Sequence, residues 1–256
     1  MGQVDNQVER QKLLVNGHEI YVEKYGSNDS PLIVLLHHGL GSVKAWQYQI
    51  PFLLENGYSV WVYDRWGYGN SADRGKLDPP WFEDDVADLF ELLKNVNEKI
   101  LLIGHSDGGN IALSYTLKYP QKICGLIVVA PHIYIEPKMV SGILALQRAY
   151  QNQASFRDGL NRIHGGKAVF DRWWQSWTNL TPNWDMREKF ANINIPVLVV
   201  QGERDEHATV NHALDCAKSI PYGQVWILSG AKHMLPQENA AEFNQKIITF
   251  INPLLK

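Results

Sequence analysis

The chain has 256 residues, of which 45% are hydrophobic and 20% are charged. This length and composition suit one large α/β domain with a fully buried sheet rather than two separate domains. A formal net charge of −3 provides no basic stripe, so we expect no nucleic-acid partner. The start of the chain has no cationic segment followed by an apolar stretch, and the apolar runs are shorter than a membrane span. We therefore expect a cytoplasmic protein without a membrane partner.

Short apolar runs alternate with helix-like stretches along most of the chain. Asn16-Gly17 supplies the positive φ values of a two-residue turn, which predicts a hairpin at an antiparallel sheet edge. The later runs are continuous, as expected of parallel strands covered on both faces. The predicted strands comprise residues 13–15, 18–25, 31–36, 60–63, 100–103, 123–130, 196–201 and 225–228. This alternation predicts an α/β fold with a mostly parallel central sheet of about eight strands and helices on both faces.

Helical spacing occurs between these strands, in particular over residues 46–55, 139–150, 211–218 and 240–251. Another helix is predicted after Pro79-Pro80, running to about Asn95. Glu83, Asp84 and Asp85 lie in its first turn, where we interpret them as charges that complement the helix dipole rather than as catalytic groups. The two cysteines, Cys124 and Cys216, are expected to be buried thiols that form no disulfide.

The alternation of strands and helices stops between about His132 and Ile195. This stretch is helix-like but irregular, and it contains the aromatic cluster Trp173, Trp174, Trp177 and Trp184. The strand pattern resumes afterwards, and no repeat or low-complexity linker is visible. We expect a helical lid inserted at about 132–195 into a single domain that spans residues 1–256.

The most informative motif is Gly104-His105-Ser106-Asp107-Gly108. It follows the apolar run Ile100 to Ile103 and precedes Ile111-Ala112-Leu113, so the chain reads strand, sharp turn, helix. A G-x-S-x-G in this context is the nucleophile elbow, in which glycines let two backbone segments pack closely around a strained serine. Ser106 is therefore the candidate nucleophile.

A serine nucleophile needs a general base and an acid that fixes the tautomer of the base. Asp205 follows the strand that ends at Gln201, and His233 lies in the loop after the strand that ends at Leu228. Carboxyl ends of strands in an open parallel sheet deliver side chains to one edge, and the order Ser, Asp, His suits this architecture. We predict Asp205 as the acid, with Glu203 in reserve, and His233 as the base.

Two backbone N–H groups are candidates for an oxyanion hole. One belongs to Asp107, at the start of the elbow helix, and the other to Leu40, in the turn His38-Gly39-Leu40-Gly41. The pair His37-His38 could suggest a metal site, but no accompanying ligand spacing such as H-E-x-x-H is present. We therefore predict no metal and no cofactor.

With these residues in place, the chain resembles an α/β-hydrolase over nearly its whole length. Four segments resemble the biphenyl-hydrolase-like, or valacyclovir-hydrolase-like, esterases: His105–Gly109, Asp64–Ser71, Phe170–Trp174 and Gly230–His233. Members of that family cleave esters of α-amino acids and hold the substrate ammonium group with the acid that follows the nucleophile. The resemblance thus implies that Asp107 binds substrate. His37 departs from the family, which has an apolar residue there.

Two substrate-binding predictions have structural alternatives. Asp107 lies at a helix N-terminus, where the dipole favours its negative charge, so it could attract a cation; alternatively it only caps that helix or bonds a neighbouring loop. Trp173, Trp174 and Trp177 could line an acyl or alcohol pocket, or they could form the lid's own small core.

These residues predict a cofactor-independent serine hydrolase that cleaves small carboxylic esters through an acyl-enzyme, and the resemblance implies α-amino-acid esters as candidate substrates. A lactonase or a carbon–carbon bond hydrolase would use the same three residues, and perhydrolysis stays open as a side activity. Epoxide hydrolases and haloalkane dehalogenases are disfavoured, because they have Asp at the elbow. A non-catalytic small-ligand receptor of the same fold is the alternative from another class.

Overall fold

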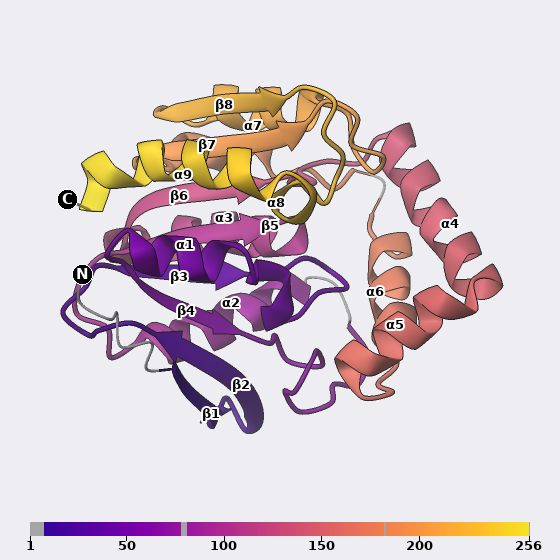
Figure 1. Cartoon of the computed structure of the whole chain (residues 1–256). Helices are drawn as coiled ribbons and strands as arrows, with labels where there is room; N and C mark the ends of the chain where they lie inside the picture. Colours follow the sequence, from indigo (N-terminus) through magenta and orange to yellow (C-terminus); the bar gives the residue numbers. More distant parts are fainter. Residues whose placement is uncertain (1–7, 78–80, 182, 256) are drawn as a thin grey trace.

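The computed structural model describes residues 8–77, 81–181 and 183–255. Within these residues, eight strands form one sheet in the order β1-β2-β4-β3-β5-β6-β7-β8 (Figure 1). Strand β2 pairs antiparallel with β1 and β4, and the other neighbours are parallel. The strands are β1 (Val8–Val15), β2 (His18–Tyr25), β3 (Leu32–Leu36), β4 (Ser59–Tyr63), β5 (Ile100–His105), β6 (Ile123–Val129), β7 (Val197–Gly202) and β8 (Gly223–Leu228). The predicted fold class is confirmed.

The hairpin of β1 and β2 forms one edge of the sheet. Asn16 and Gly17 adopt φ values of 48° and 89°, and Val15 pairs with His18 across the turn. Positive φ at both central residues gives the turn the twist that two antiparallel strands need. The predicted hairpin and its edge position are confirmed.

Alternate residues of each central strand enter two different hydrophobic layers. In β3, Leu32, Val34 and Leu36 contribute to one layer, whereas Ile33 and Leu35 contribute to the other. All five are buried, and each side chain of this kind contributes about 1.5–3 kcal/mol to stability. The central strands therefore need helices on both faces.

Those helices come from separate parts of the chain. The layer that contains Leu32 is completed by α2 (Trp81–Leu93), α3 (Asp107–Lys118) and α7 (Asn211–Ser219). The opposite layer is completed by α1 (Gln49–Glu55), α8 (Leu235–Glu238) and α9 (Ala240–Leu255) (Figure 1). The predicted helices over residues 211–218 and 240–251 are thus present, while Pro79-Pro80 lies outside the described residues.

The helix predicted over residues 46–55 is wrong in its first turn. A short 3-10 helix covers Val43–Trp46, and α1 begins only at Gln49. The Ser42 hydroxyl accepts a hydrogen bond from the Lys44 N–H at 3.3 Å. This cap starts a separate turn upstream, and Trp46 is buried at the end of that turn rather than inside α1.

Three helices connect β6 to β7: α4 (Pro137–Asn152), α5 (Ala154–His164) and α6 (Val169–Thr178). They lie together beyond the carboxyl ends of the parallel strands, at the right of Figure 1. The strand-to-helix loops that carry the candidate site residues end at this same edge. The three helices therefore face those loops and not the sheet.

Two further expectations concern the cysteines and the membrane. Neither Cys124 nor Cys216 forms a disulfide; Cys216 is buried and Cys124 is partly buried. Over residues 8–77, 81–181 and 183–255, no helix has both the length and the apolar character that crossing a bilayer requires.

Candidate active site

Ser106 stands at the sharp corner between β5 and α3. Its backbone has φ 54° and ψ −119°, a conformation that L residues adopt only when the surrounding structure enforces it. A Cβ on Gly104 would lie 2.2 Å from the carbonyl oxygen of Gly108, and a Cβ on Gly108 would lie 2.2 Å from that of Leu36. Only glycines allow β3, β5 and α3 to approach this closely. The two glycines of the motif therefore permit the corner that presents Ser106.

Asp205 and His233 meet in the loops that follow β7 and β8. The His233 Nδ1 lies 2.8 Å from Asp205 Oδ2. Asp205 is fully buried, and its carboxylate also accepts hydrogen bonds from Gln201 Nε2 and from the N–H groups of His207 and Ala208. The reserve candidate Glu203 is exposed and bonds Ser229 and Gly230 instead. Of these two acids, only Asp205 contacts the imidazole.

Asp205 and His233 each favour the charged form of the other. Burial disfavours ionisation of both groups, but the neighbouring carboxylate of Asp205 outweighs this for His233 and raises the pKa of its imidazole above the ordinary value. In the same way the His233 ring outweighs burial at Asp205, whose pKa is lowered. A buried carboxylate that stays ionised holds the proton of the imidazole on Nδ1 and leaves Nε2 free to accept one.

The turn that carries the Leu40 N–H is closed by its own backbone. The Gly41 N–H donates to the His38 carbonyl at 3.0 Å. His37 braces this turn, because its Nε2 accepts the Arg65 N–H at 3.1 Å, which leaves Nδ1 protonated to donate to the His38 carbonyl at 2.8 Å. Both ring nitrogens of His37 are thus used, which explains why a histidine stands there.

A second histidine ties the same turn to helix α5. His164 Nδ1 accepts the Gly69 N–H at 3.0 Å, so its Nε2 carries the proton and lies 3.2 Å from the Leu40 carbonyl oxygen. Asp107 supplies the other N–H, at the first position of α3, where no acceptor exists within the helix. The two predicted oxyanion N–H groups are therefore on a braced turn and a helix N-terminus.

The carboxylate of Asp107 is already engaged. It is 1% exposed; its Oδ2 lies 3.4 Å from Arg65 Nη2, and its Oδ1 accepts the Trp177 Nε1–H at 3.2 Å. Arg65, which follows β4, also approaches Asp85 at 3.6 Å. This geometry matches the alternative in which Asp107 bonds a neighbouring loop. It also shows that Asp85, interpreted from sequence as a helix-start charge, is a buried partner of two arginines, Arg65 and Arg74.

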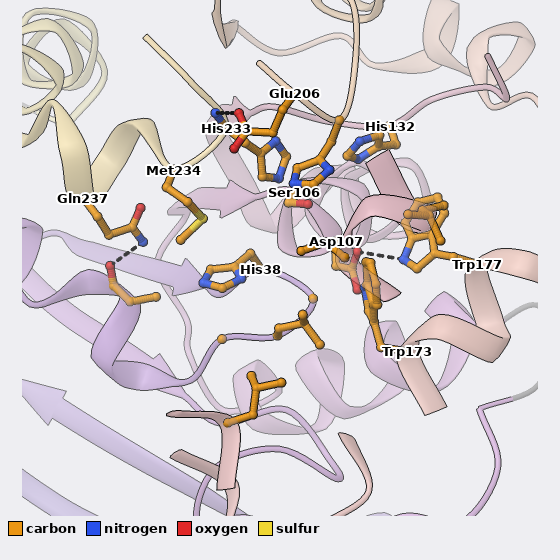
Figure 2. A pocket seen from close by; sticks show the side chains of 18 of the residues that line it. His38, Ser106, Asp107, His132, Trp173, Trp177, Glu206, His233, Met234 and Gln237 are labelled. Atoms are coloured by element: carbon orange, nitrogen blue, oxygen red, sulfur yellow. Dashed lines mark hydrogen bonds between the residues drawn. The ribbon is translucent and has the colours of Figure 1, made fainter. Parts of the chain in front are cut away.

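Most of the candidate residues line one cavity of about 460 Å³ (Figure 2); Asp205 lies behind His233 and is not among the lining residues. Ser106, Asp107 and His233 line it together with the turn from His38 to Ser42. Trp173 and Trp177 also line it, since they are one helical turn apart on α6. Trp174, which we predicted to bind substrate, is not among the lining residues. It is rotated by about 100° from Trp173 around the helix and is partly buried against the hydrophobic core, to which Trp173 and Trp177 also belong.

Sequence reasoning missed most of the apolar wall of the cavity. Residues at positions i, i+4 and i+7 of two consecutive helices form it: Met139, Ile143 and Leu146 on α4, and Phe156, Leu160 and Ile163 on α5. The amphipathic pattern over residues 139–150 was the available signal. Sequence reasoning also missed five lining residues with polar or flexible side chains: His132, Lys44, Glu206, Met234 and Gln237.

No group of three or more His, Cys, Asp or Glu side chains in the described part of the chain is arranged to hold a metal ion. His37 is occupied by the two hydrogen bonds given above, so it has no free nitrogen for a ligand role.

The parallel sheet, the serine corner at its edge and the residues around it define an α/β-hydrolase. A solved structure of similar fold is the bromoperoxidase from Bacillus anthracis, with a TM-score of 0.78 and 24% identity over 95% of this chain and 100% of that one. The chain belongs to the serine aminopeptidase S33 family, which it matches over residues 28–162.

Two curated relatives cover almost the whole chain. The proline iminopeptidase of Saccharolobus solfataricus is 28% identical over 92% of this chain and 90% of that protein. The serine hydrolase BPHL of Homo sapiens is 27% identical over 94% of this chain and 85% of that protein. The resemblance to biphenyl-hydrolase-like esterases seen in the sequence is confirmed, and the chain is a hydrolase.

Proposed function

We propose that this protein is a serine esterase that cleaves small, uncharged carboxylic esters through an acyl-enzyme. Ser106 attacks the ester carbonyl, and His233 takes the hydroxyl proton and returns it to the departing alcohol. Asp205 holds the imidazole in the required tautomer. Water, activated by His233, then attacks the acyl-enzyme and releases the acid. The proposal rests above all on His233, which lines the same cavity as the strained Ser106 and lies 2.8 Å from the Asp205 carboxylate.

The N–H groups of Leu40 and Asp107 would hold the oxyanion of each tetrahedral intermediate. Each such donor contributes about 3 kcal/mol to transition-state stabilisation in other hydrolases. The bracing of the Leu40 turn by His37 and His164 favours this role, because donors that are already oriented cost no reorganisation during the reaction. Helices α4 to α6 would act as a lid that completes the cavity.

The contacts of Asp107 support an uncharged substrate. The biphenyl-hydrolase-like resemblance suggests an α-ammonium group at this carboxylate, and an aminopeptidase would also need a carboxylate for the substrate amine. Here the charge of Asp107 is balanced by buried Arg65 at 3.4 Å. The other carboxylate of the cavity, Glu206, is exposed to solvent and accepts a hydrogen bond from the backbone N–H of His233. A substrate ammonium group buried in the cavity would therefore find no unpaired carboxylate.

The test is labelling and turnover by wild type, Ser106→Ala and Ser114→Ala. Ser114 lies on the same helix α3 but does not line the cavity. We expect a fluorophosphonate to label wild type and Ser114→Ala, and Ser106→Ala to lose labelling and at least about 10³-fold in ester hydrolysis. Wild type that neither labels nor cleaves any ester would establish the non-catalytic receptor instead.

A substrate panel separates the enzyme alternatives. It contains p-nitrophenyl hexanoate, phenylalanine methyl ester, prolyl p-nitroanilide, acyl lactones and a dienoate diketone. We expect the uncharged ester to give the highest kcat/KM. Faster cleavage of the amino-acid ester or the prolyl anilide would contradict our interpretation of Asp107, and exclusive cleavage of lactones or of the diketone would establish one of the other two reactions.

A further inference from the structure

His132 is a buried polar residue of the cavity wall that the proposed mechanism does not use. It follows β6, lines the cavity with Ser106 and His233, and is only 6% exposed. Its Nδ1 has no hydrogen-bond partner among the residues that the structure describes. A buried polar atom without a partner costs free energy, so such an atom beside a nucleophile calls for an explanation.

The position of the His132 ring is fixed by its surroundings. The Asn110 side chain, on α3, accepts a hydrogen bond from the backbone N–H of His132 at 3.1 Å and donates one to the backbone carbonyl of His132. The ring then lies between those of Trp177 and His233, with centroid separations of 5.4 and 5.6 Å (Figure 2). The imidazole is thus held at a defined place between the proposed base and the indole that bonds Asp107.

His212 does not provide His132 with a hydrogen-bond partner. His212 is the nearest candidate on the opposite side, at a centroid separation of 5.9 Å. Its Nδ1 accepts the Ile133 N–H at 3.1 Å, so its proton is on Nε2, which lies 3.3 Å from Glu136. The Nδ1 of His212 is therefore used by the backbone, and its Nε2 lies next to Glu136 without a hydrogen-bond partner of its own among the described residues.

The His132 ring is uncharged and faces a cavity without an unpaired buried charge. Burial and the neighbouring His233 lower the pKa of His132 well below its ordinary value. A neutral imidazole offers one N–H donor and one acceptor nitrogen, which suit a hydroxyl or a carbonyl oxygen. The rest of the wall is the apolar surface of α4 and α5, which suits a hydrocarbon group.

We propose that His132 is a specificity-determining residue whose ring hydrogen-bonds an uncharged oxygen on the substrate. The substrate class is then an ester that carries a hydroxyl or keto group close to the scissile bond and an apolar chain for the α4–α5 wall. The inference rests on the proposed esterase function, and it adds a recognition element to it. The bond would be made by the ring nitrogen that faces the cavity, and a site built to bond such a group discriminates against the analogue that lacks it.

The test compares matched esters with and without a hydroxyl group. The acyl series contains methyl hexanoate and its 2-hydroxy and 3-hydroxy derivatives, and the alcohol series contains ethyl hexanoate and 2-hydroxyethyl hexanoate. We expect wild type to prefer a hydroxylated member of one series by about tenfold in kcat/KM, as one hydrogen bond provides. The series that shows the preference identifies the side of the ester that His132 contacts.

Three variants assign the preference to the ring. His132→Phe should abolish it, while His132→Asn, which keeps a polar atom near Nδ1, or His132→Gln, which keeps one near Nε2, should retain part of it. Retention of the full preference in His132→Phe, or no preference in wild type for either series, would overturn the proposal. If methyl hexanoate is cleaved without any preference, only the role of His132 fails; if no ester is cleaved, the esterase function fails as well. The carboxamide variants keep the test valid should the Phe variant not fold.

Discussion

Replacing Asp205 by Asn tests the proposed catalytic roles of Ser106, His233 and Asp205 at the least exposed of the three residues. The amide oxygen of the new side chain can keep the two backbone bonds that Asp205 Oδ1 accepts, from the N–H groups of His207 at 2.8 Å and Ala208 at 3.2 Å. The amide NH₂ then occupies the place of Oδ2. Gln201 can adapt by turning its own amide, because its Oε1 has no partner among the described residues. We therefore expect Asp205→Asn to fold.

The same change reverses the tautomer of His233. Next to an amide NH₂, Nδ1 must accept a hydrogen bond, so the proton of the ring moves to Nε2. A base that already carries its proton on Nε2 cannot take the one from Ser106. Loss of the correct tautomer in an equivalent triad lowers kcat by about 10⁴-fold, which corresponds to about 5 kcal/mol of transition-state stabilisation.

The pH profile gives a second readout. Because the pKa of His233 is raised in wild type, the acidic limb of kcat/KM should lie above pH 6.5, the ordinary value, with activity falling as the pH drops through the pKa of His233. Without the carboxylate, burial dominates and the limb should move to lower pH. The control is Glu203→Gln, the same change on the exposed acid of the same loop, which we expect to stay within threefold of wild type, about 0.7 kcal/mol. An Asp205→Asn enzyme within tenfold of wild type, or an inactive Glu203→Gln enzyme, would refute the assignment.

Two further predictions concern the free energy of unfolding, measured with denaturant. Gly104→Ala places a Cβ 2.2 Å from a backbone oxygen of α3 and should cost about 3 kcal/mol or more. The control is Gly159→Ala on α5, where a Cβ would have only Arg162 Nη2 nearby, at 3.9 Å, and which should stabilise the protein by about 0.5–1 kcal/mol. Similar effects at both sites would contradict the close packing of the elbow. Arg65→Met leaves Asp107 and Asp85 buried without this cation and should cost about 3–5 kcal/mol. Burial already raises the pKa of Asp85 to about 6, so the folded state binds its proton more tightly than the unfolded state, and the destabilising contribution of this carboxylate diminishes as the pH falls through about 6. The loss in Arg65→Met should accordingly be larger at pH 8 than at pH 5, and an equal loss at both would show that these carboxylates do not need Arg65.

Local patterns were enough to predict the sheet and the elbow. Continuous apolar runs mark strands buried on both faces, and Asn16-Gly17 marks the hairpin, because each signal depends on a few neighbouring residues. The serine corner is equally local, because the two glycines that it requires lie within the five residues from Gly104 to Gly108. The meeting of Asp205 and His233 was predictable as well, since both follow parallel strands whose carboxyl ends must lie at one edge.

Contacts between distant segments could not be predicted in this way. Whether Asp107 is available to a cation depends on Arg65, which lies 42 positions away in the chain. Arg65 reaches Asp107 because β4 and β5, the strands that precede the two residues, both pair with β3. Likewise, Trp173 and Trp174 are adjacent residues of the same type, and only the rotation of α6 against the cavity decides that Trp173 lines it and Trp174 does not. His132 carried no motif at all. Its importance arises from an unpaired nitrogen, and pairing in a folded chain is a property of the packed side chains rather than of their order.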